Sequence, residues 1–560
     1  MLRMLAGRGL GQRRAARIVM KHYDYIIVGA GSAGCVLARR LTDSGQHSVL
    51  LIEAGGSDAS PRIGVPVGYA LTFRDPRFNW MYQAEADPGF AGRTAHWPRG
   101  KVLGGSSAIN AMVFARGQPG DYDDWCAAGN GGWGWQDVLP YFKRLEDHAL
   151  GASEFHGSGG PVHVHAPSSE VHPLCSAFIA ACAEAGIPRT DDFNGAQPEG
   201  AGLWQVNIRK GVRESSARAY LRPVRARSQL SVLLRAHVLK VNFSGTRATG
   251  VQYRHGGELH QASARREVIL AAGAIGSPQL LELSGVGDPQ RLTDLGIPVV
   301  AAASAVGEGL QDHVCVSYFY RSKVPTLNEE LGPLSGKIKA ALRYALRRDG
   351  PLAMSVNQAG AFVRSRAGLA RPNLHIYFNP ASYSTDTGES HRLMSPDPFP
   401  GFLMSFNTCR PTSRGSVHIR SADAFAQPAI QPNSIATPED IADVYEGART
   451  LRRIAAASAL AQVIAAERLP GPAVTSDEQV LEDFRARGGS VYHASCTCAM
   501  GPDPRTHVVD ARLRVHGVTG LRVVDASVFP NVTSANTNAP VMMVAEKASD
   551  LILEDARAAG

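Results

Sequence analysis

The 560-residue sequence has no long apolar run and few cysteines. No uninterrupted apolar run approaches the roughly 18 residues that cross a bilayer, so we expect no membrane-spanning helix. The eight cysteines are scattered, and the close pair Cys496-x-Cys498 has no partners at metal-site spacing. We therefore expect a reduced compartment, no structural disulfide and no metal centre.

Charge of one sign is in excess only at the N-terminus. The formal net charge is +8, and six basic residues fall in the first 22 positions, where Asp and Glu are absent: Arg3, Arg8, Arg13, Arg14, Arg17 and Lys21. The small charge that remains argues against a nucleic-acid-binding body. The arm, residues 1–21, resembles a transit peptide. An extended start upstream of Met20 is the preferred interpretation. We expect the arm to be disordered or removed in either case.

The remaining sequence is organised around residues 23–56. Two apolar runs, 25–28 and 49–52, flank a glycine turn and a segment of helical spacing. The turn has the spacing Gly29-x-Gly31-x-x-Gly34, and the second run leads into Glu53. This order predicts a strand, a turn, a helix and a second strand that bind a dinucleotide.

Each residue type in this unit has a physical role. Gly29 permits the tight turn, Gly31 lets backbone approach a pyrophosphate, and Gly34 allows close packing of helix on strand. Glu53 stands where a carboxylate accepts hydrogen bonds from a ribose diol. NAD, NADP and FAD are not distinguished by the turn alone, although the acid disfavours NADP.

Further elements follow along the chain. Helical spacing marks residues 171–186, and strand patterns at 230–234, 239–243 and 250–253 predict a meander attached to the nucleotide-binding sheet. Residues 266–273 read as a buried strand, followed by a short helix at 277–283. From about 317 to 486 the pattern changes to mixed strands with one long helix, 441–467. These changes predict a second domain.

The C-terminal segment concentrates polar groups. His493 lies in the stretch SVYHASCTCAMG, residues 490–501. A strand at 521–524 leads into Asp525. A helix predicted at 541–553 opens at Pro540, and its free amides can stabilise negative charge on a ligand. Four polar residues crowd the approach to that helix: Asn531, Asn536, Thr537 and Asn538.

With these blocks in place, the sequence resembles the glucose-methanol-choline (GMC) flavoprotein oxidoreductases, in particular the choline dehydrogenase-like alcohol dehydrogenases. The resemblance covers residues 23–553. It rests on the glycine fingerprint, GKVLGGSSxIN at 100–110, GAxxSPxLLxxSGVG at 273–287, and the terminal His493 with Asn538. A fifth block, VGEGLQDH at 306–313, has Gly309 where the family usually has Asn.

The resemblance implies an α/β fold: a Rossmann-like FAD-binding domain interleaved with an α+β substrate-binding domain that contains an antiparallel sheet. The FAD-binding domain would comprise residues 22–165, 205–316 and 487–555. The substrate-binding domain would comprise 166–204 and 317–486.

It also implies FAD and the residues that hold it. The ADP half would contact Gly29, Gly31, Ser32, Gly34, Glu53 and, through its backbone, Val238. The riboflavin half would contact Leu103, Gly104, Ser107, Asn110, Asp525 and Asn538. Some members attach the flavin to a histidine just before the equivalent of Asn110. Ile109 occupies that position here, so we expect non-covalent FAD.

Alcohol oxidation needs a base for the hydroxyl proton, and histidine suits working pH. We hypothesise that His493 takes the proton and Asn538 holds the substrate oxygen, while hydride passes to flavin N5. Amides of the helix opening at Pro540 would stabilise the negative charge that develops near N1. The electrons would pass to a quinone-like acceptor or to O2.

The predicted substrate is an uncharged primary alcohol. Choline enzymes carry a glutamate to face the trimethylammonium group, and Gln358 stands at that place here. Trp80 and Tyr492 are candidates for the substrate pocket, either as an aromatic surface for a cation or as cavity-wall aromatics. Choline dehydrogenase is therefore kept as an alternative, together with an alcohol oxidase.

More remote alternatives are a fatty acid photodecarboxylase, a flavoprotein without turnover and an NAD-dependent dehydrogenase. Ser382 occupies the position of the photodecarboxylase cysteine, and the presence of both His493 and Asn538 argues against loss of turnover. Cys496 and Cys498 are expected to be small packing residues.

Residues 334–348 combine apolar residues at a four-residue spacing with basic residues elsewhere. A stripe packed on the core under a solvated face is the preferred interpretation, and contact with a membrane surface is the alternative. A cytoplasmic location is expected, with contact to the inner membrane left open. The oligomeric state is not predicted.

Overall fold

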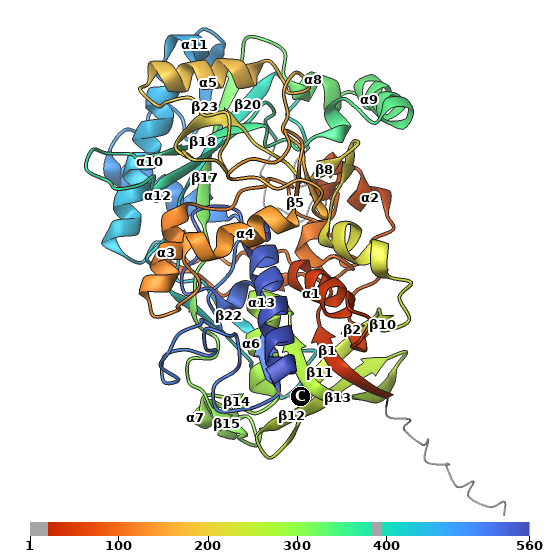
Figure 1. Ribbon diagram of the computed structural model, residues 1–560. Coiled ribbons are helices and arrows are strands. Elements are labelled where there is room, and N and C mark those ends of the chain that lie inside the picture. Colours follow the sequence, from red (N-terminus) through yellow and green to blue (C-terminus); the bar gives the residue numbers. More distant parts are fainter. Residues whose placement is uncertain (1–20, 384–394, 559–560) are drawn as a thin grey trace, which may run out of the picture.

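The computed structural model describes residues 21–383 and 395–558 (Figure 1). The predicted N-terminal arm therefore lies outside the described residues, except for Lys21, which opens the first strand. Two large sheets occupy the lower and upper parts of Figure 1, and the chain passes between them several times.

The lower sheet has the strand order β10-β2-β1-β13-β12-β11, with β25 paired to β13. The strands β1, β2, β10, β13 and β25 pair in parallel, whereas β11, β12 and β13 form an antiparallel meander. The bounds are β1 (Lys21–Val28), β2 (Val49–Ile52), β10 (Leu230–Leu233), β11 (Ala236–Ser244), β12 (Arg247–His255), β13 (Glu258–Leu270) and β25 (Leu521–Val523).

Two helices from opposite ends of the chain pack together beside this sheet, α1 (Ser32–Thr42) and α13 (Asn538–Ala558) (Figure 1). The helix α1 approaches the strands closely because Gly34 has no side chain: a Cβ there would lie 1.9 Å from the Gly29 carbonyl oxygen. Any larger residue at this position would push the helix off the turn.

The upper sheet is antiparallel, with the order β23-β17-β20-β19-β18-β7, and β24 pairs with β17. Every residue of β18, β19 and β20 is buried, so both faces are covered. The bounds are β7 (Gly200–Leu203), β17 (Val314–Ser322), β18 (Ala359–Val363), β19 (Leu374–Asn379), β20 (Gly401–Thr408), β23 (Ile464–Leu469) and β24 (Gly489–Ser490).

Helices cover and connect the two sheets. The longer ones are α3 (Pro119–Ala127), α4 (Trp135–Leu145), α5 (Leu174–Glu184), α6 (Gly273–Leu283), α9 (Leu334–Arg347), α10 (Pro438–Ala456) and α12 (Asp477–Arg487). Short elements used below are η1 (Pro66–Leu71), η3 (Gly105–Ala108), α8 (Leu327–Leu331), η6 (Pro351–Ala353) and α11 (Ser458–Ala461). The predicted fold class, a Rossmann-like unit interleaved with an antiparallel sheet, is confirmed.

The predicted long helix at 441–467 is wrong in its last third. The helix α10 ends at Ala456, and Ala457 is extended, with φ −63° and ψ 141°. After the single turn of α11 the chain forms β23 on the edge of β17. The segment is rich in alanine, which favours a helix locally, but pairing with an open sheet edge outweighs that preference.

Residues 334–348 form the predicted helix, but the prediction that its apolar stripe packs on the core is wrong. The helix forms as α9, but its core-facing residues are Ala340 and Tyr344, and the four large apolar side chains are exposed.

All eight cysteines carry free thiols. Of the helices that the structure describes, none combines the length and apolar character needed to cross a membrane.

Candidate functional site

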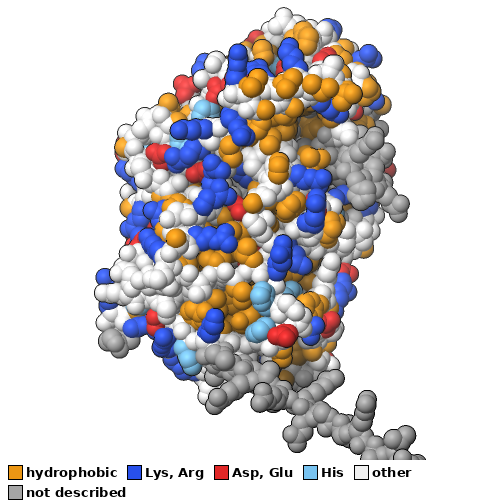
Figure 2. All heavy atoms as spheres, turned by 90° about the vertical axis from the view of Figure 1, so that its right-hand side faces the viewer, with side chains coloured by type: hydrophobic (Ala, Val, Ile, Leu, Met, Phe, Trp, Pro, Cys, Tyr) orange, Lys and Arg blue, Asp and Glu red, His pale blue; other side chains and the backbone are white. Residues whose placement is uncertain are grey.

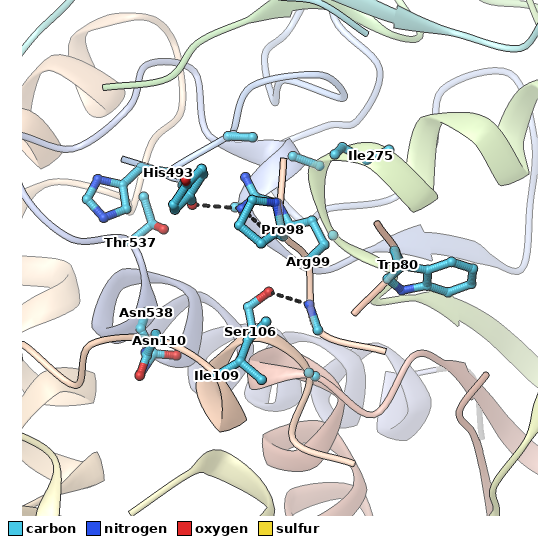
Figure 3. A pocket seen from close by; sticks show the side chains of 18 of the residues that line it. Trp80, Pro98, Arg99, Ser106, Ile109, Asn110, Ile275, His493, Thr537 and Asn538 are labelled. Carbon is cyan, nitrogen blue, oxygen red and sulfur yellow. Dashed lines mark hydrogen bonds between the residues drawn. The ribbon is translucent and has the colours of Figure 1, made fainter. Parts of the chain in front are cut away.

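A cavity of about 570 Å3 is lined by residues of both sheets. Its wall includes Gly29 and Glu53, which follow β1 and β2, and Val238 from β11 of the lower sheet. Ser317, Tyr377 and Ser405 line it from the upper sheet. Figure 3 shows His493 and Trp80 on opposite sides of this space. The cavity is therefore long, with the glycine turn at Gly29 in one part and His493 in another.

Two glycine turns meet at the first part of the cavity. Gly29 has a φ of +101°, and a Cβ there would lie 2.4 Å from the Ala271 carbonyl oxygen. Gly105, at the start of η3, would place a Cβ 2.6 Å from the Cα of Gly31. The backbone amides at the N-terminus of α1, beginning at Ser32, adjoin this contact and suit a pyrophosphate.

Glu53 follows the last residue of β2 and lines the same part of the cavity. Its Oε2 accepts from the Ala30 amide at 2.9 Å, and its Oε1 accepts from the Gly55 amide at 2.8 Å. Burial raises the pKa of this carboxyl to about 7. Each oxygen keeps a free lone pair, so the group is held in place to accept from a diol.

Most of the predicted cofactor residues come together in the cavity wall: Gly29, Gly31, Ser32, Glu53, Asn110, Val238, Asp525 and Asn538. Four others stand behind it, namely Gly34, Leu103, Gly104 and Ser107. In their place Gly105, Ser106 and Ile109 form the surface. The Ser107 hydroxyl donates to the Gly104 carbonyl at 2.5 Å and accepts from the Ser216 amide, so it shapes the turn.

Polar side chains in this wall are fixed by neighbouring backbone. Asp525 accepts from the Gly273 amide at 2.8 Å and from the Ser277 hydroxyl at 2.6 Å, which ties the end of β25 to the start of α6. Asn110 accepts from Arg213 at 2.8 Å. Asn538, the first residue of α13, accepts from the Ser32 hydroxyl at 2.7 Å.

His493 is buried, and both of its ring nitrogens have partners. Its Nδ1 lies 2.8 Å from His313 Nδ1, and His313 Nε2 lies 3.0 Å from the Cys409 carbonyl oxygen. A carbonyl only accepts, so the proton of neutral His313 is on Nε2 and its Nδ1 is an acceptor. His493 must then carry its own proton on Nδ1. The Nε2 of His493 therefore has no proton and is a hydrogen-bond acceptor.

Asn536 faces the lone pair of that nitrogen. Its Nδ2 donates to His493 Nε2 at 3.1 Å, and its Oδ1 accepts from the Tyr377 hydroxyl at 3.3 Å. Because His493 Nε2 can only accept in this tautomer, the amide nitrogen of Asn536 is the end that faces the imidazole. Asn536 and Tyr377 both line the cavity. The His493 lone pair and an amide donor thus converge on one place in the wall.

The electrostatic surroundings keep His493 neutral. Burial, and then the neighbouring His313, His375 and Arg99, hold its pKa well below the ordinary value of 6.5. The Asp312 carboxylate accepts from the His493 backbone amide at 2.6 Å and fixes the main chain there. An imidazole with a lowered pKa is unprotonated at neutral pH and ready to accept a proton.

The three predicted substrate-pocket residues are separated. Tyr492 adjoins His493 in the wall, with its carbonyl held by Arg99 at 2.9 Å. Trp80 lines another part, stacked on Tyr82 with a ring spacing of 5.7 Å and beside His237. Gln358 is not among the described wall residues. It is buried, and its Oε1 accepts from the His172 amide at 2.8 Å.

Three residues at the His493 end were not predicted from the sequence. His313 lies in the VGEGLQDH block without having been singled out, and Tyr377 carried no signal beyond an apolar strand. Asn536 was one of four crowded polar residues, but Asn538 was preferred as the partner of His493. Only the turn before α13 decides which of the two amides reaches the imidazole.

Comparison with protein families identifies two matches. The N-terminal GMC oxidoreductase domain matches residues 23–315, and the C-terminal GMC oxidoreductase domain matches residues 411–545. The oxygen-dependent choline dehydrogenase of Photobacterium profundum is 43% identical over 95% of this chain and 93% of its own length. The alcohol dehydrogenase [acceptor] of Pseudomonas putida is 40% identical over 95% and 96%.

Among solved structures, an FAD-dependent oxidoreductase from Chaetomium thermophilum superposes with a TM-score of 0.87 at 26% identity. The match covers 96% of this chain and all of the other. The sequence blocks, the two interleaved sheets and the family matches agree over most of the chain. This chain belongs to the GMC oxidoreductase family.

Proposed function

We propose that this protein oxidises a primary alcohol to the aldehyde with FAD as its cofactor. The observation that carries the proposal is the acceptor lone pair of His493 Nε2, which faces Asn536 in the wall of a cavity that also contains a dinucleotide-binding turn. The kinship to a named choline dehydrogenase and a named alcohol dehydrogenase supports the reaction class.

The described residues fit FAD. A Cβ on Gly105 would lie 2.6 Å from the Gly31 Cα, so the two turns approach closely where a pyrophosphate would bind, and Glu53 is held to accept from a ribose. Asn110, Asp525 and Asn538 continue the polar wall towards His493. Ile109 lines the cavity with a side chain that cannot form a bond to flavin, so we propose non-covalent attachment.

The chain's own residues handle the hydroxyl proton. An alcohol oxygen that replaces the Asn536 contact at His493 Nε2 would donate its proton to that nitrogen. The positive charge that develops on the ring is shared through Nδ1–H with His313, whose Nδ1 accepts. When bound, FAD supplies at N5 the acceptor for the hydrogen that leaves the alcohol carbon with its electron pair.

Asn536 takes the orienting role that sequence analysis gave to Asn538. The Asn536 amide nitrogen already points at the place where the alcohol oxygen would sit, so it can donate to that oxygen as the proton leaves. Asn538, bonded to Ser32 at the start of α1, is proposed to contact the cofactor instead. Thr537 and Asn538 place the N-terminus of α13 in the cavity wall, where its amides favour negative charge.

The proposed substrate is uncharged. Among the described residues that line the cavity, the carboxylates are Glu53 and Asp525, and both are held by hydrogen bonds in the cofactor part. Tyr69, Phe73 and Tyr383 add aromatic surface to the wall. Choline remains the second candidate, because the similar choline dehydrogenase supports it and aromatic rings bind quaternary ammonium groups.

A quinone-like acceptor or O2 would take the electrons. The proposed location of the protein is the cytoplasm. Anaerobic bleaching of the flavin absorbance tests the function. We expect bleaching by uncharged primary alcohols, none by the methyl ethers of the same alcohols, and flavin released into the supernatant on acid precipitation. If only choline bleached the flavin, choline would be the substrate in place of an uncharged alcohol. A protein that binds FAD but is bleached by no alcohol would contradict the proposal.

A further inference from the structure

The helix α9 presents an apolar stripe away from the protein. It rests on the body through Ala340 and Tyr344, and the Tyr344 hydroxyl donates to the Gly211 carbonyl at 2.9 Å. Four large apolar side chains at a four-residue spacing are exposed, with exposed fractions of 74%, 53%, 59% and 82% for Leu334, Ile338, Leu342 and Leu346. The spacing places them on one side of the helix.

Basic residues border this stripe. Between residues 334 and 348 the sequence has five basic residues and no acidic one: Lys337, Lys339, Arg343, Arg347 and Arg348. At 100° per residue, Lys339, Arg343 and Arg347 follow one edge of the stripe, and Lys337 follows the other. Arg343 pairs with Asp349 at 2.6 Å, which leaves the helix strongly basic.

Further exposed residues lie on elements that share a packing partner or a hydrogen bond with α9. Leu71, at the end of η1, is 58% exposed, and η1 packs against η6, on which α9 also packs. Lys210 is exposed next to Gly211, the residue bonded to Tyr344. Figure 2 views the side of the molecule that carries α9 and shows hydrophobic and Lys or Arg side chains interspersed there. We call Leu71 and the four apolar residues of α9 the α9 patch.

An apolar stripe bordered by cations suits one kind of partner. Apolar side chains gain free energy when they enter the acyl boundary of a bilayer, while lysine and arginine reach back to the phosphates. A second copy of this chain would bring two strongly basic helices together, which like-charge repulsion opposes. We propose that the α9 patch docks this protein on the surface of an anionic phospholipid bilayer, with α9 lying in the plane of the headgroups.

Docking in this orientation has a consequence for the cavity. The residues on either side of Leu71 in η1 and the following turn, Tyr69 and Phe73, line the cavity wall. The α9 patch thus shares η1 with the wall of the site. A bilayer under the patch would lie on the side of the molecule from which that aromatic wall is built. An apolar compound dissolved in the lipid would then lie close to this wall.

Sedimentation of the FAD-loaded full chain with lipid vesicles tests the proposal without turnover. We expect binding to phosphatidylcholine vesicles that contain about 30% phosphatidylglycerol, and binding at least about tenfold weaker to pure phosphatidylcholine. The variant L342Q/L346Q should bind anionic vesicles at least about tenfold more weakly. The variant K339Q/R347Q should lose a similar factor and much of the dependence on salt.

Matched controls replace exposed residues elsewhere. Leu150 and Leu259 are 77% and 50% exposed, so L150Q/L259Q removes comparable apolar surface and should bind like wild type. All variants should keep wild-type turnover with a soluble acceptor, because the α9 residues that they alter lie outside the cavity wall. Absent binding to anionic vesicles, or equal loss in control and α9 variants, would overturn the proposal. So would a dimer in vesicle-free ultracentrifugation that L342Q/L346Q abolishes.

Discussion

Removing the His313 side chain tests how the protein sets the proton on His493. His313 Nδ1 accepts from His493 Nδ1–H at 2.8 Å, because the Cys409 carbonyl requires the His313 proton on Nε2. In His313→Ala the His493 ring loses the acceptor that selects its tautomer. It also loses the partner that shares its charge once it has taken the alcohol proton.

The expected size follows from the second loss. A hydrogen bond to a charged group contributes about 1.5 to 3 kcal/mol, and about 1.4 kcal/mol is a factor of ten in rate. Anaerobic stopped-flow bleaching of the flavin by the best alcohol should therefore slow about 10- to 150-fold.

A matched control separates this effect from loss of a buried ring. His148 is buried, stacks on His156 at 3.9 Å and lies outside the described cavity wall, so His148→Ala should leave the bleaching rate and its pH profile unchanged. The reasoning would be refuted by a folded, FAD-loaded His313→Ala protein whose bleaching rate stays within threefold of wild type.

Three further predictions concern the same cavity. In Asn536→Ala the donor to His493 Nε2 is lost, and we expect bleaching about tenfold slower; a change below twofold would remove Asn536 from the site. In Gly105→Ala a methyl group would meet the Cα of Gly31 at 2.6 Å, so flavin bound per polypeptide, read from absorbance, should fall at least tenfold, and full occupancy would contradict the assignment. Burial holds the pKa of His493 below 6.5, so the base is unprotonated above that pH. We therefore expect kcat/KM to be constant above pH 6.5 and to fall only at lower pH. An acid limb with its midpoint above pH 6.5 would contradict this prediction.

The dinucleotide unit could be predicted because its signals are local. The turn from Gly29 to Gly34 and the acid Glu53 lie within one strand, turn, helix and strand, and each role follows from the backbone there. The strands predicted at 230–234, 239–243 and 250–253 form as β10, β11 and β12, but the predicted meander is only partly right: β10 pairs in parallel with β2, and β13 completes the meander with β11 and β12.

The errors share a different cause. The strand β23 depends on the free edge of β17, which lies more than a hundred residues earlier in the chain, and α9 is exposed because of how the rest of the protein packs. Asn536 lies two residues before Asn538, the first residue of α13, and only the three-dimensional turn decides which amide meets His493. The sequence pattern placed Gln358 in the substrate pocket, but its side chain lies outside the described cavity wall and accepts a hydrogen bond from the His172 amide.

The central claim is that His493 is the base for the alcohol proton. The direct measurement is anaerobic flavin bleaching by the best primary alcohol in His493→Ala, with FAD content checked beforehand by absorbance. Loss of a positioned general base costs about 100- to 10,000-fold, so bleaching should become at least about 100-fold slower while FAD stays bound. Bleaching near the wild-type rate in the loaded variant would contradict the assignment of His493.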